Sequence, residues 1–390
     1  MTNLKNLLFL VLLIPIFSFG QVTSGTINGS VLNDQNQPVI GAIVKATHLA
    51  SGSVYGAATR SNGRFEIQGL RVGGPYKVEA SAISVGKTSV EDVYVKLGDP
   101  TSLTLTINAT NQQIKEVVVT GKSSLINSER TGAATNVGAA QLATMPTVSR
   151  NITDFTRLAP QSGASFSSGL NNSNTFGGRD GRYNNLQVNG ANLNNGFGLS
   201  SNLTPGGSGQ PFSLDAIEEL QIGISPFDIK QSGFTGANVN AVTRSGTNEF
   251  HGSAYGFYRS NGMIGDMVDN VNLDVQKNSN AILGARLGGP IIKNKLFFFG
   301  NFEYEKYVYP GITWVPNNST ASGNRSSVSG DSLKKFSDYL LSKYGYETGP
   351  YENYGNDFIN KNIKMLGRID WNINEKNKMY FSYSQLNSSE

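Results

Sequence analysis

Long segments in which apolar and polar residues alternate make up much of the chain from Glu249 onward. An alternation of period two predicts β-strands that have one apolar and one polar face. The segments cover roughly 249–259, 280–288, 296–308, 362–372 and 377–387. Each has about nine residues or more, which is the length that a tilted strand needs to cross a membrane. We therefore expect five membrane-spanning strands in this part of the chain.

The two faces of these expected strands differ in chemistry. In the fourth strand, Ile363, Met365, Gly367, Ile369 and Trp371 alternate with Lys364, Leu366, Arg368, Asp370 and Asn372. In the third, Phe298, Phe302 and Tyr304 alternate with Asn301, Glu303 and Glu305. In the fifth, Met379, Phe381 and Tyr383 alternate with Lys378, Ser382 and Ser384. An apolar face suits lipid, and a polar face suits the lumen of a barrel.

The connections between the expected strands alternate between long and short. The short ones are 290–295 and 374–377, and the long ones are 260–279 and 309–361. Outer-membrane barrels alternate short periplasmic turns with long extracellular loops in this way, whereas the alternative of a soluble sandwich gives no reason for it. The pattern predicts the first strands of an antiparallel barrel, with both long connections outside the cell.

Five strands cannot close a barrel, because the smallest barrels have about eight strands. Each backbone group left unpaired in hydrocarbon costs several kcal/mol, so two open edges are not tolerated. We expect the chain to be a piece of a longer protein. The alternative is that it recruits strands from copies of itself.

The first twenty residues predict a signal peptide. Lys5 supplies a positive charge, Leu7–Phe19 is apolar, and Ser18-Phe19-Gly20 offers small residues for cleavage before Gln21. The alternative is a membrane anchor, but about thirteen apolar residues are too few to cross about 30 Å of hydrocarbon. After Gln21 no run of about eighteen apolar residues occurs, which excludes a helical membrane protein.

Composition excludes several functions. The chain has no cysteine and two histidines, His48 and His251, neither of which has a glutamate at a zinc-site spacing. Asp180 and the pair Glu218-Glu219 are far apart in the sequence and have no histidine partner. A net charge of +4 over 390 residues is too dilute for nucleic acid. We therefore predict no catalytic residue, no metal or cofactor and no nucleic-acid partner.

Residues 21–108 read as about seven short strands with turn residues between them, which predicts a β-sandwich. The sequence Ser61-Asn62-Gly63 predicts a hairpin that pairs 54–60 with 64–68, because Asn-Gly tolerates positive φ. The expected core residues are those that alternate with polar neighbours: Ile27, Val31, Ile40, Ala42, Val44, Ala46, Phe65, Ile67, Tyr76, Val78, Leu103, Leu105 and Ile107.

Four runs in this segment resemble the carboxypeptidase regulatory-like domain. They are Thr26–Val31, Gly41–Val44, Thr59–Ile67 and Gly74–Val78. The resemblance implies a transthyretin-like sandwich, which is often grouped with carbohydrate-binding-like folds, and not the catalytic domain of a carboxypeptidase.

Residues 109–123 change to a polar linker that contains Glu116, Val117, Val118, Val119 and Thr120. Consecutive valines favour an extended backbone, and a strand on a flexible tether can be captured by the sheet edge of another protein. The segment resembles the energy-transduction box of TonB-dependent receptors, which implies that these five residues bind TonB. The alternative is that they form the first strand of the next domain.

Residues 124–248 are rich in glycine and asparagine and contain several distinctive phrases. Phe176–Arg182 precedes an expected strand at Leu186–Val188 and an expected turn at Asn189-Gly190. Asp215–Leu220 has helical spacing and an acidic start, so we expect a helix there. Together with Ser232–Thr247, these phrases resemble the α+β plug domain of TonB-dependent receptors, with wording similar to the Oar-like subgroup.

The resemblance implies a mainly β protein of the cell outer membrane: sandwich, linker 109–123, plug 124–248 and the start of a barrel at 249–390. It implies import of an extracellular ligand of the siderophore, oligosaccharide or peptide class, energised by the TonB–ExbB–ExbD complex, without enzyme activity. Outer-membrane lipid and a surface lipoprotein are further expected partners. The candidate ligand-facing plug residues are Asn171, Asn172, Asn174, Asn194, Asn195 and Asn202. The alternative is an outer-membrane adhesin whose sandwich binds carbohydrate.

Overall fold

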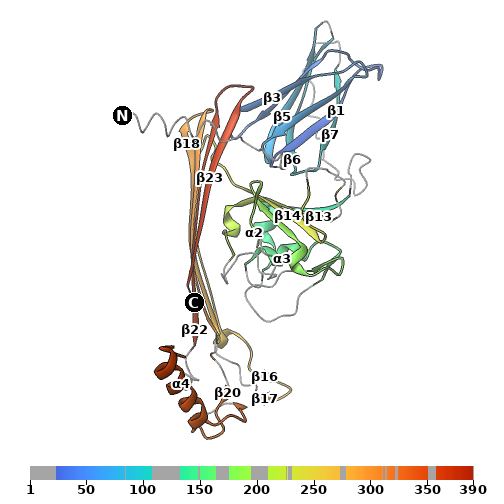
Figure 1. The fold of residues 1–390 in the computed structure, drawn as a ribbon. Helices are drawn as coiled ribbons and strands as arrows, with labels where there is room; N and C mark the ends of the chain where they lie inside the picture. Colours follow the sequence, from blue (N-terminus) through green and yellow to red (C-terminus); the bar gives the residue numbers. More distant parts are fainter. Residues whose placement is uncertain are drawn as a thin grey trace.

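The computed structural model consists of a sandwich, a middle domain and an open sheet (Figure 1). It describes residues 23–83, 85–107, 132–147, 150–163, 175–194, 210–224, 226, 231–272, 278–309, 311, 314–320, 324–349 and 357–389. The predicted signal peptide, 1–20, and the linker 109–123 lie outside the described residues.

The N-terminal sandwich is built from two sheets. The first has the order β4–β1–β7, and the second has the order β3–β2–β5–β6. Its strands are β1 (Gly25–Asn33), β2 (Ile43–His48), β3 (Ser53–Ala58), β4 (Arg64–Leu70), β5 (Gly73–Ala82), β6 (Gly86–Val95) and β7 (Thr101–Ile107). β1 and β7 are parallel, and the other neighbours in the two sheets are antiparallel.

The core of the sandwich contains the expected residues with one exception. Ile27, Val44 and Tyr76 are fully buried, and every other predicted core residue is also buried except Ile40. Ile40 is 66% exposed. It precedes Gly41, which has a φ of +70°, and this turn breaks the alternation before β2 begins. The expectation for Ile40 was therefore wrong.

The turn at Ser61-Asn62-Gly63 forms, but it does not make the hairpin that the sequence predicts. Gly63 has a φ of +70°, and the amide of Arg64 donates to Oδ1 of Asn62 at 3.1 Å. However, β3 pairs with β2 in one sheet, and β4 pairs with β1 in the other. The turn therefore carries the chain from one sheet to the other, where β4 buries Phe65 and Ile67.

The middle domain, residues 132–243, has a mixed five-stranded sheet of order β12–β11–β14–β13–β8. The strands are β8 (Ala133–Gly138), β11 (Asn185–Val188), β12 (Ala191–Asn192), β13 (Ile217–Ile224) and β14 (Ala237–Thr243). The helices are α2 (Ala139–Thr144), α3 (Ile152–Thr156), η1 (Gly181–Tyr183) and η2 (Leu214–Ala216), and β9 (Ser162–Gly163) pairs with β10 (Thr175–Phe176). Asn189 and Gly190 have positive φ and connect β11 to β12, so the predicted turn is confirmed.

The expected helix at Asp215–Leu220 was wrong. A single 3₁₀ turn, η2, is capped by the side chain of Ser213, and the chain then continues as β13. β13 lies between β14 and β8, and both neighbours supply main-chain hydrogen bonds. Burial between two strands overrides helical spacing in so short a segment, because local propensity is worth less than the lost pairing.

The barrel sheet is a five-stranded antiparallel sheet of order β15–β18–β19–β22–β23. Its strands are β15 (His251–Ser260), β18 (Ser279–Ile292), β19 (Leu296–Tyr309), β22 (Phe358–Asn372) and β23 (Lys378–Ser389), which confirms the five predicted strands. The first long connection carries η3 (Asn261–Met263), β16 (Met267–Val268) and β17 (Val271–Asn272), and the second carries β20 (Trp314–Val315), β21 (Asn324–Arg325) and α4 (Gly330–Tyr344). In Figure 1 the tight turns lie beside the sandwich, and α4 lies at the opposite end of the sheet.

The polar face of the barrel sheet is buried, and its apolar face is exposed. Asn362, Lys364 and Asp370 on β22 are buried, whereas Met365 and Ile369 on the same strand are more than 40% exposed. This is the inverse of a soluble protein and matches a strand that faces lipid outward and a lumen inward.

Among the described residues, no helix has both the length and the apolar character needed to cross a membrane.

We expect Met365→Arg to destabilise the protein by about 2–4 kcal/mol, because Met365 is exposed at the centre of β22 and faces the expected hydrocarbon. Ile359→Arg is the matched control, since Ile359 is on the same face near the end of β22 and its expected cost is about 0–1 kcal/mol. Urea unfolding in lipid vesicles measures both. Equal costs for the two variants would contradict the assignment of this face to lipid.

Candidate functional site

Most of the residues that the sequence proposes for function lie outside the described residues. This holds for Glu116, Val117, Val118, Val119 and Thr120, and also for Asn171, Asn172, Asn174, Asn195 and Asn202. Asn194 is the exception. Its Nδ2 donates to Oδ1 of Asn185 at 2.7 Å, and its Oδ1 accepts from the amide of Leu186 at 2.7 Å. These bonds fix the β11–β12 hairpin, and a ligand-facing role for Asn194 stays a prediction.

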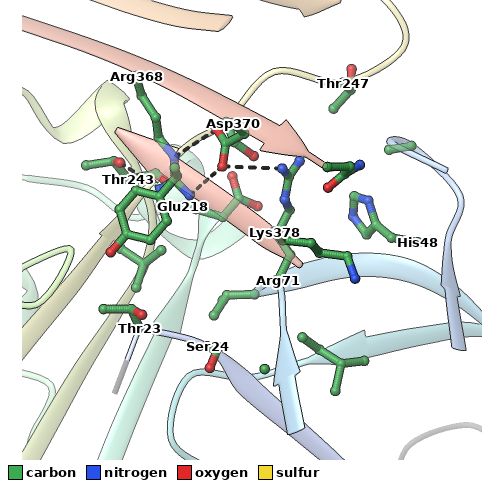
Figure 2. Close-up of a pocket in the computed structure, with 18 of the residues that line it drawn as sticks. Thr23, Ser24, His48, Arg71, Glu218, Thr243, Thr247, Arg368, Asp370 and Lys378 are labelled. Atoms are coloured by element: carbon green, nitrogen blue, oxygen red, sulfur yellow. Dashed lines mark hydrogen bonds and ion pairs between the residues drawn. The ribbon is translucent and has the colours of Figure 1, made fainter. Parts of the chain in front are cut away.

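A cavity of about 310 Å³ lies where the sandwich, the middle domain and the barrel sheet meet (Figure 2). His48 and Arg71 line it from the sandwich, Thr243 from the middle domain, and Arg368 and Asp370 from the barrel sheet. All three parts of the molecule therefore contribute side chains to one site.

Asp370 is the centre of an ion-pair cluster at this cavity. Nη2 of Arg368 lies 2.8 Å from its Oδ1, and Nε of Arg368 donates to its Oδ2 at 2.9 Å. Nη2 of Arg71 lies 3.3 Å from the same Oδ1. Figure 2 shows the two guanidinium groups on either side of the carboxylate. Arg368 and Asp370 are buried, so each charge depends on its partner.

Arg368 also holds the middle domain. Its Nη1 donates to the carbonyl oxygen of Thr243 at 3.0 Å and to Oγ1 of Thr243 at 3.1 Å. The guanidinium lies 4.5 Å from the ring centroid of Tyr380, whose hydroxyl donates to the carbonyl oxygen of Asn189 at 3.0 Å. The end of β14 and the Asn189-Gly190 turn are therefore bonded to β22 and β23.

A second cluster joins the middle domain to the barrel sheet inside the expected lumen. Nζ of Lys364 lies 2.9 Å from Oε1 of Glu303 and 3.1 Å from Oε2 of Glu305. Oε2 of Glu303 accepts from Oγ of Ser213 at 2.8 Å and from the hydroxyl of Tyr255 at 2.8 Å. Ser213 belongs to the middle domain, so the buried carboxylate links it to three barrel strands.

Arg150 and Asp215 form a third contact between the middle domain and the barrel wall. Nη2 of Arg150 lies 2.6 Å from Oδ2 of Asp215, and its guanidinium lies 3.9 Å from the ring centroid of Phe257. Nη1 of Arg286 donates to the carbonyl oxygen of Asp215 at 3.0 Å. Ser213 and Asp215 thus bind the barrel sheet through hydrogen bonds, and Ala216 packs beside them against Phe299 and Leu366.

Side chains of the middle domain bind the backbone of Leu97, which follows β6 of the sandwich. Oε1 of Glu219 accepts from the amide of Leu97 at 3.0 Å and from Nδ2 of Asn136 at 2.7 Å. Nε2 of Gln221 donates to the carbonyl oxygen of Leu97 at 2.7 Å, and Nδ2 of Asn136 donates to it at 2.9 Å. Burial raises the pKa of Glu219, and the bonds from Asn136 and Leu97 oppose that rise.

His48 is buried beside the cavity and is uncharged. Its Nδ1 lies 2.7 Å from Oγ of Ser51, and its ring centroid lies 4.8 Å from that of Tyr76. Burial, together with the positive charge of Arg71, lowers the pKa of His48 to about 3. Across the described part of the chain, no group of three or more His, Asp or Glu side chains is placed to hold a metal ion.

Sequence reasoning did not single out the residues of the cavity. Arg368 and Asp370 carried a signal, because they are charged positions that alternate with apolar ones in a membrane strand. Arg71 carried none, since it lies in a turn between two strands of the sandwich and its partners are far away in the sequence.

Two family models match the chain. The carboxypeptidase regulatory-like domain matches residues 26–108, and an outer membrane beta barrel domain matches residues 242–390. Among curated proteins, the chain is 28% identical over 195 residues to the TonB-dependent transporter Oar of Myxococcus xanthus, which covers 47% of this chain and 17% of Oar. The chain thus spans less than a fifth of the length of that relative.

Solved structures show weaker likenesses. The siderophore receptor PirA from Acinetobacter baumannii is 19% identical, with 66% of this chain and 32% of PirA covered and a TM-score of 0.43. The outer membrane transporter YddB from Escherichia coli is 11% identical, with 65% and 33% covered and a TM-score of 0.44.

The two domain matches coincide with the sandwich and with the barrel sheet. The chain therefore joins a carboxypeptidase regulatory-like domain to part of an outer membrane beta barrel domain, and it resembles a fragment of an Oar-like TonB-dependent receptor.

Proposed function

We propose that this chain works as part of an energised importer, in which a ligand binds outside the cell and the middle domain moves to admit it. In this proposal the middle domain is the plug, the barrel sheet is one wall of the barrel, and Glu116–Thr120 is the strand that TonB binds. The ligand belongs to the siderophore, oligosaccharide or peptide class. No covalent chemistry takes part.

The interface between the middle domain and the barrel sheet carries this proposal. The bonds that cross it are hydrogen bonds, which can break and re-form: Ser213 donates to Glu303, Arg286 donates to the carbonyl oxygen of Asp215, and Arg368 donates to the carbonyl oxygen of Thr243. The opposite face of the sheet is apolar and exposed, as a wall in lipid requires. A plug that is bound to the barrel sheet by such contacts can act as a movable barrier more readily than a plug that is permanently packed against it.

The ligand is expected to arrive at the end of the sheet that carries α4. This helix lies far from the sandwich (Figure 1), and Phe336, Tyr339 and Tyr344 on it are exposed. Aromatic side chains on exposed loops offer faces for sugar rings or planar ligands. Six asparagines of the plug are proposed to contact the ligand: Asn171, Asn172, Asn174, Asn194, Asn195 and Asn202.

We expect Val118→Pro to reduce capture of the purified TonB C-terminal domain by at least about tenfold. Proline removes a backbone donor from the centre of the strand that TonB is proposed to pair with. The measurement is capture by the full-length protein, immobilised in detergent. Ser123→Pro is the control, because it places the same residue in the linker outside Glu116–Thr120. Unchanged capture by Val118→Pro would refute the TonB assignment.

A further inference from the structure

The sandwich contacts both of the parts that the proposed transport cycle separates. It is bonded to the middle domain through Leu97 and to the barrel sheet through Arg71 and the loop between β2 and β3. A domain that only displays a binding surface needs neither set of contacts.

Leu97 and Gly98 of the sandwich fit closely against the middle domain. Leu97 is fully buried and packs with Val72 and Val242, while three polar side chains bind its backbone amide and carbonyl. Gly98 has a φ of +62°, and a Cβ atom there would lie 2.6 Å from Nε2 of Gln221. A side chain at this position would displace the Gln221 amide that binds Leu97 and would strain the backbone, so glycine suits it.

Arg71 binds both the connection between β14 and β15 and the barrel sheet. Nη1 of Arg71 donates to the carbonyl oxygen of Gly246, which lies between β14 and β15, and Nη2 pairs with Asp370 on β22. The guanidinium also lies 5.7 Å from the ring centroid of Phe297 on β19. One side chain of the sandwich therefore binds the connection that leaves the middle domain and the barrel wall beside it.

The loop between β2 and β3, together with the first two residues of β3, lies on the tight turns of the barrel sheet. Asn372 donates from Nδ2 to Oγ of Ser53 at 2.9 Å, and Nζ of Lys378 donates to the carbonyl oxygen of Val54 at 2.9 Å. The amide of Asn248, just before β15, donates to the carbonyl oxygen of Ala50 at 2.8 Å. These bonds fix the sandwich to the barrel at a distance from Leu97.

We propose that the sandwich holds the middle domain against the barrel sheet by binding both of them, and we call this role a brace. Arg71 is its positioning residue. Leu97 binds β8 and β13, the β2–β3 loop binds the barrel turns, and Arg71 completes the connection at Asp370. Before the middle domain can move away from the barrel sheet, the sandwich must break its contacts with one of these two parts. This role goes beyond the proposed transport function and does not depend on TonB.

The test is hydrogen exchange of the full-length protein in detergent, without TonB. Arg71→Ala removes a bond to a carbonyl and an ion pair, and we expect exchange of the β14 amides to rise about tenfold. Arg71→Lys keeps one charge but not the two-pronged geometry, so its effect should be intermediate. Arg60→Ala is the matched control, because Arg60 is 76% exposed on the same domain and should leave β14 unchanged.

Two further variants separate docking from misfolding. Asp370→Asn weakens the Arg71 contact from the barrel side and also the Arg368 pair that binds Thr243, so it should raise β14 exchange more than Arg71→Ala does while the sandwich amides keep their protection. The pair Gly52→Cys and Asn294→Cys can join sandwich to barrel, since a Cβ on Gly52 would lie 3.4 Å from that of Asn294, close to disulfide geometry. Gly52 has a φ of +65°, which strains any other residue, so the same cysteine pair with Arg71 intact is the control for that strain. The chain has no other cysteine to compete.

In the Arg71→Ala background, oxidation of this pair should restore the protection of β14, and reduction should remove it again. A rise in exchange that the disulfide reverses supports the brace. Unchanged β14 exchange in Arg71→Ala, or a rise that the disulfide does not reverse, overturns it. Neither result depends on TonB capture, so a failure of the brace is distinct from a failure of the transport proposal.

Discussion

Replacement of Lys364 by methionine is expected to lower the free energy of unfolding by about 3–5 kcal/mol. The Lys364 side chain is 4% exposed and lies between the carboxylates of Glu303 and Glu305. Methionine fills a similar volume but leaves two like charges buried without their cation. Ser213 and Tyr255 still donate to Glu303, and these two bonds cannot replace the ion pairs.

The measurement is urea unfolding of the full-length protein in lipid vesicles. The triple variant Lys364→Met, Glu303→Gln and Glu305→Gln should recover most of the lost stability, because no unpaired charge then remains. Lys361→Met is the control on the same strand, since Lys361 is exposed and its replacement should change the stability by less than about 0.5 kcal/mol. A loss below about 1 kcal/mol for Lys364→Met would show that the cluster does not hold the wall together.

The second large effect is a loss of stability of the sandwich as the pH falls. His48 titrates near pH 6.5 when unfolded, but its pKa in the folded sandwich is about 3, because burial and Arg71 disfavour the charged ring. Between these values the unfolded state binds a proton that the folded state does not, so stability falls as the pH falls. The loss is about 2 kcal/mol between pH 6.5 and 5 and reaches about 4 kcal/mol at pH 3. Above pH 6.5 this contribution is constant.

Pulse proteolysis in urea at pH 7 and pH 5 measures the effect on the sandwich within the full-length protein. His48→Gln cannot titrate, so its stability should fall by about 2 kcal/mol less than that of the wild type over this range. His251→Gln should behave as the wild type, because the His251 side chain is 69% exposed. An equal fall in His48→Gln and wild type would exclude His48 as the titrating group.

The sequence by itself determined the strands of the barrel sheet and the faces that they present. In β22, Met365 and Lys364 point to opposite sides because side chains in any strand alternate, and no tertiary contact changes that period. The sandwich core was likewise readable from its alternation, as at Ile27 and Val44. Local geometry was also sufficient for the Asn189-Gly190 turn, because both residues accept positive φ.

The alternation of apolar and polar residues does not determine which strands pair or which charges meet, and tertiary structure decided both. Glu219 lies in a strand and not in the expected helix, because β14 and β8 bond the segment from both sides. The turn at Asn62-Gly63 carries the chain between two sheets, a choice that depends on which sheet buries β4. Arg71, Arg368 and Asp370 meet only when three domains pack together, and the pairing of charges so far apart in the chain depends on distance in space. The period of a strand is a property of the backbone, whereas the partner of a charge is a property of the fold.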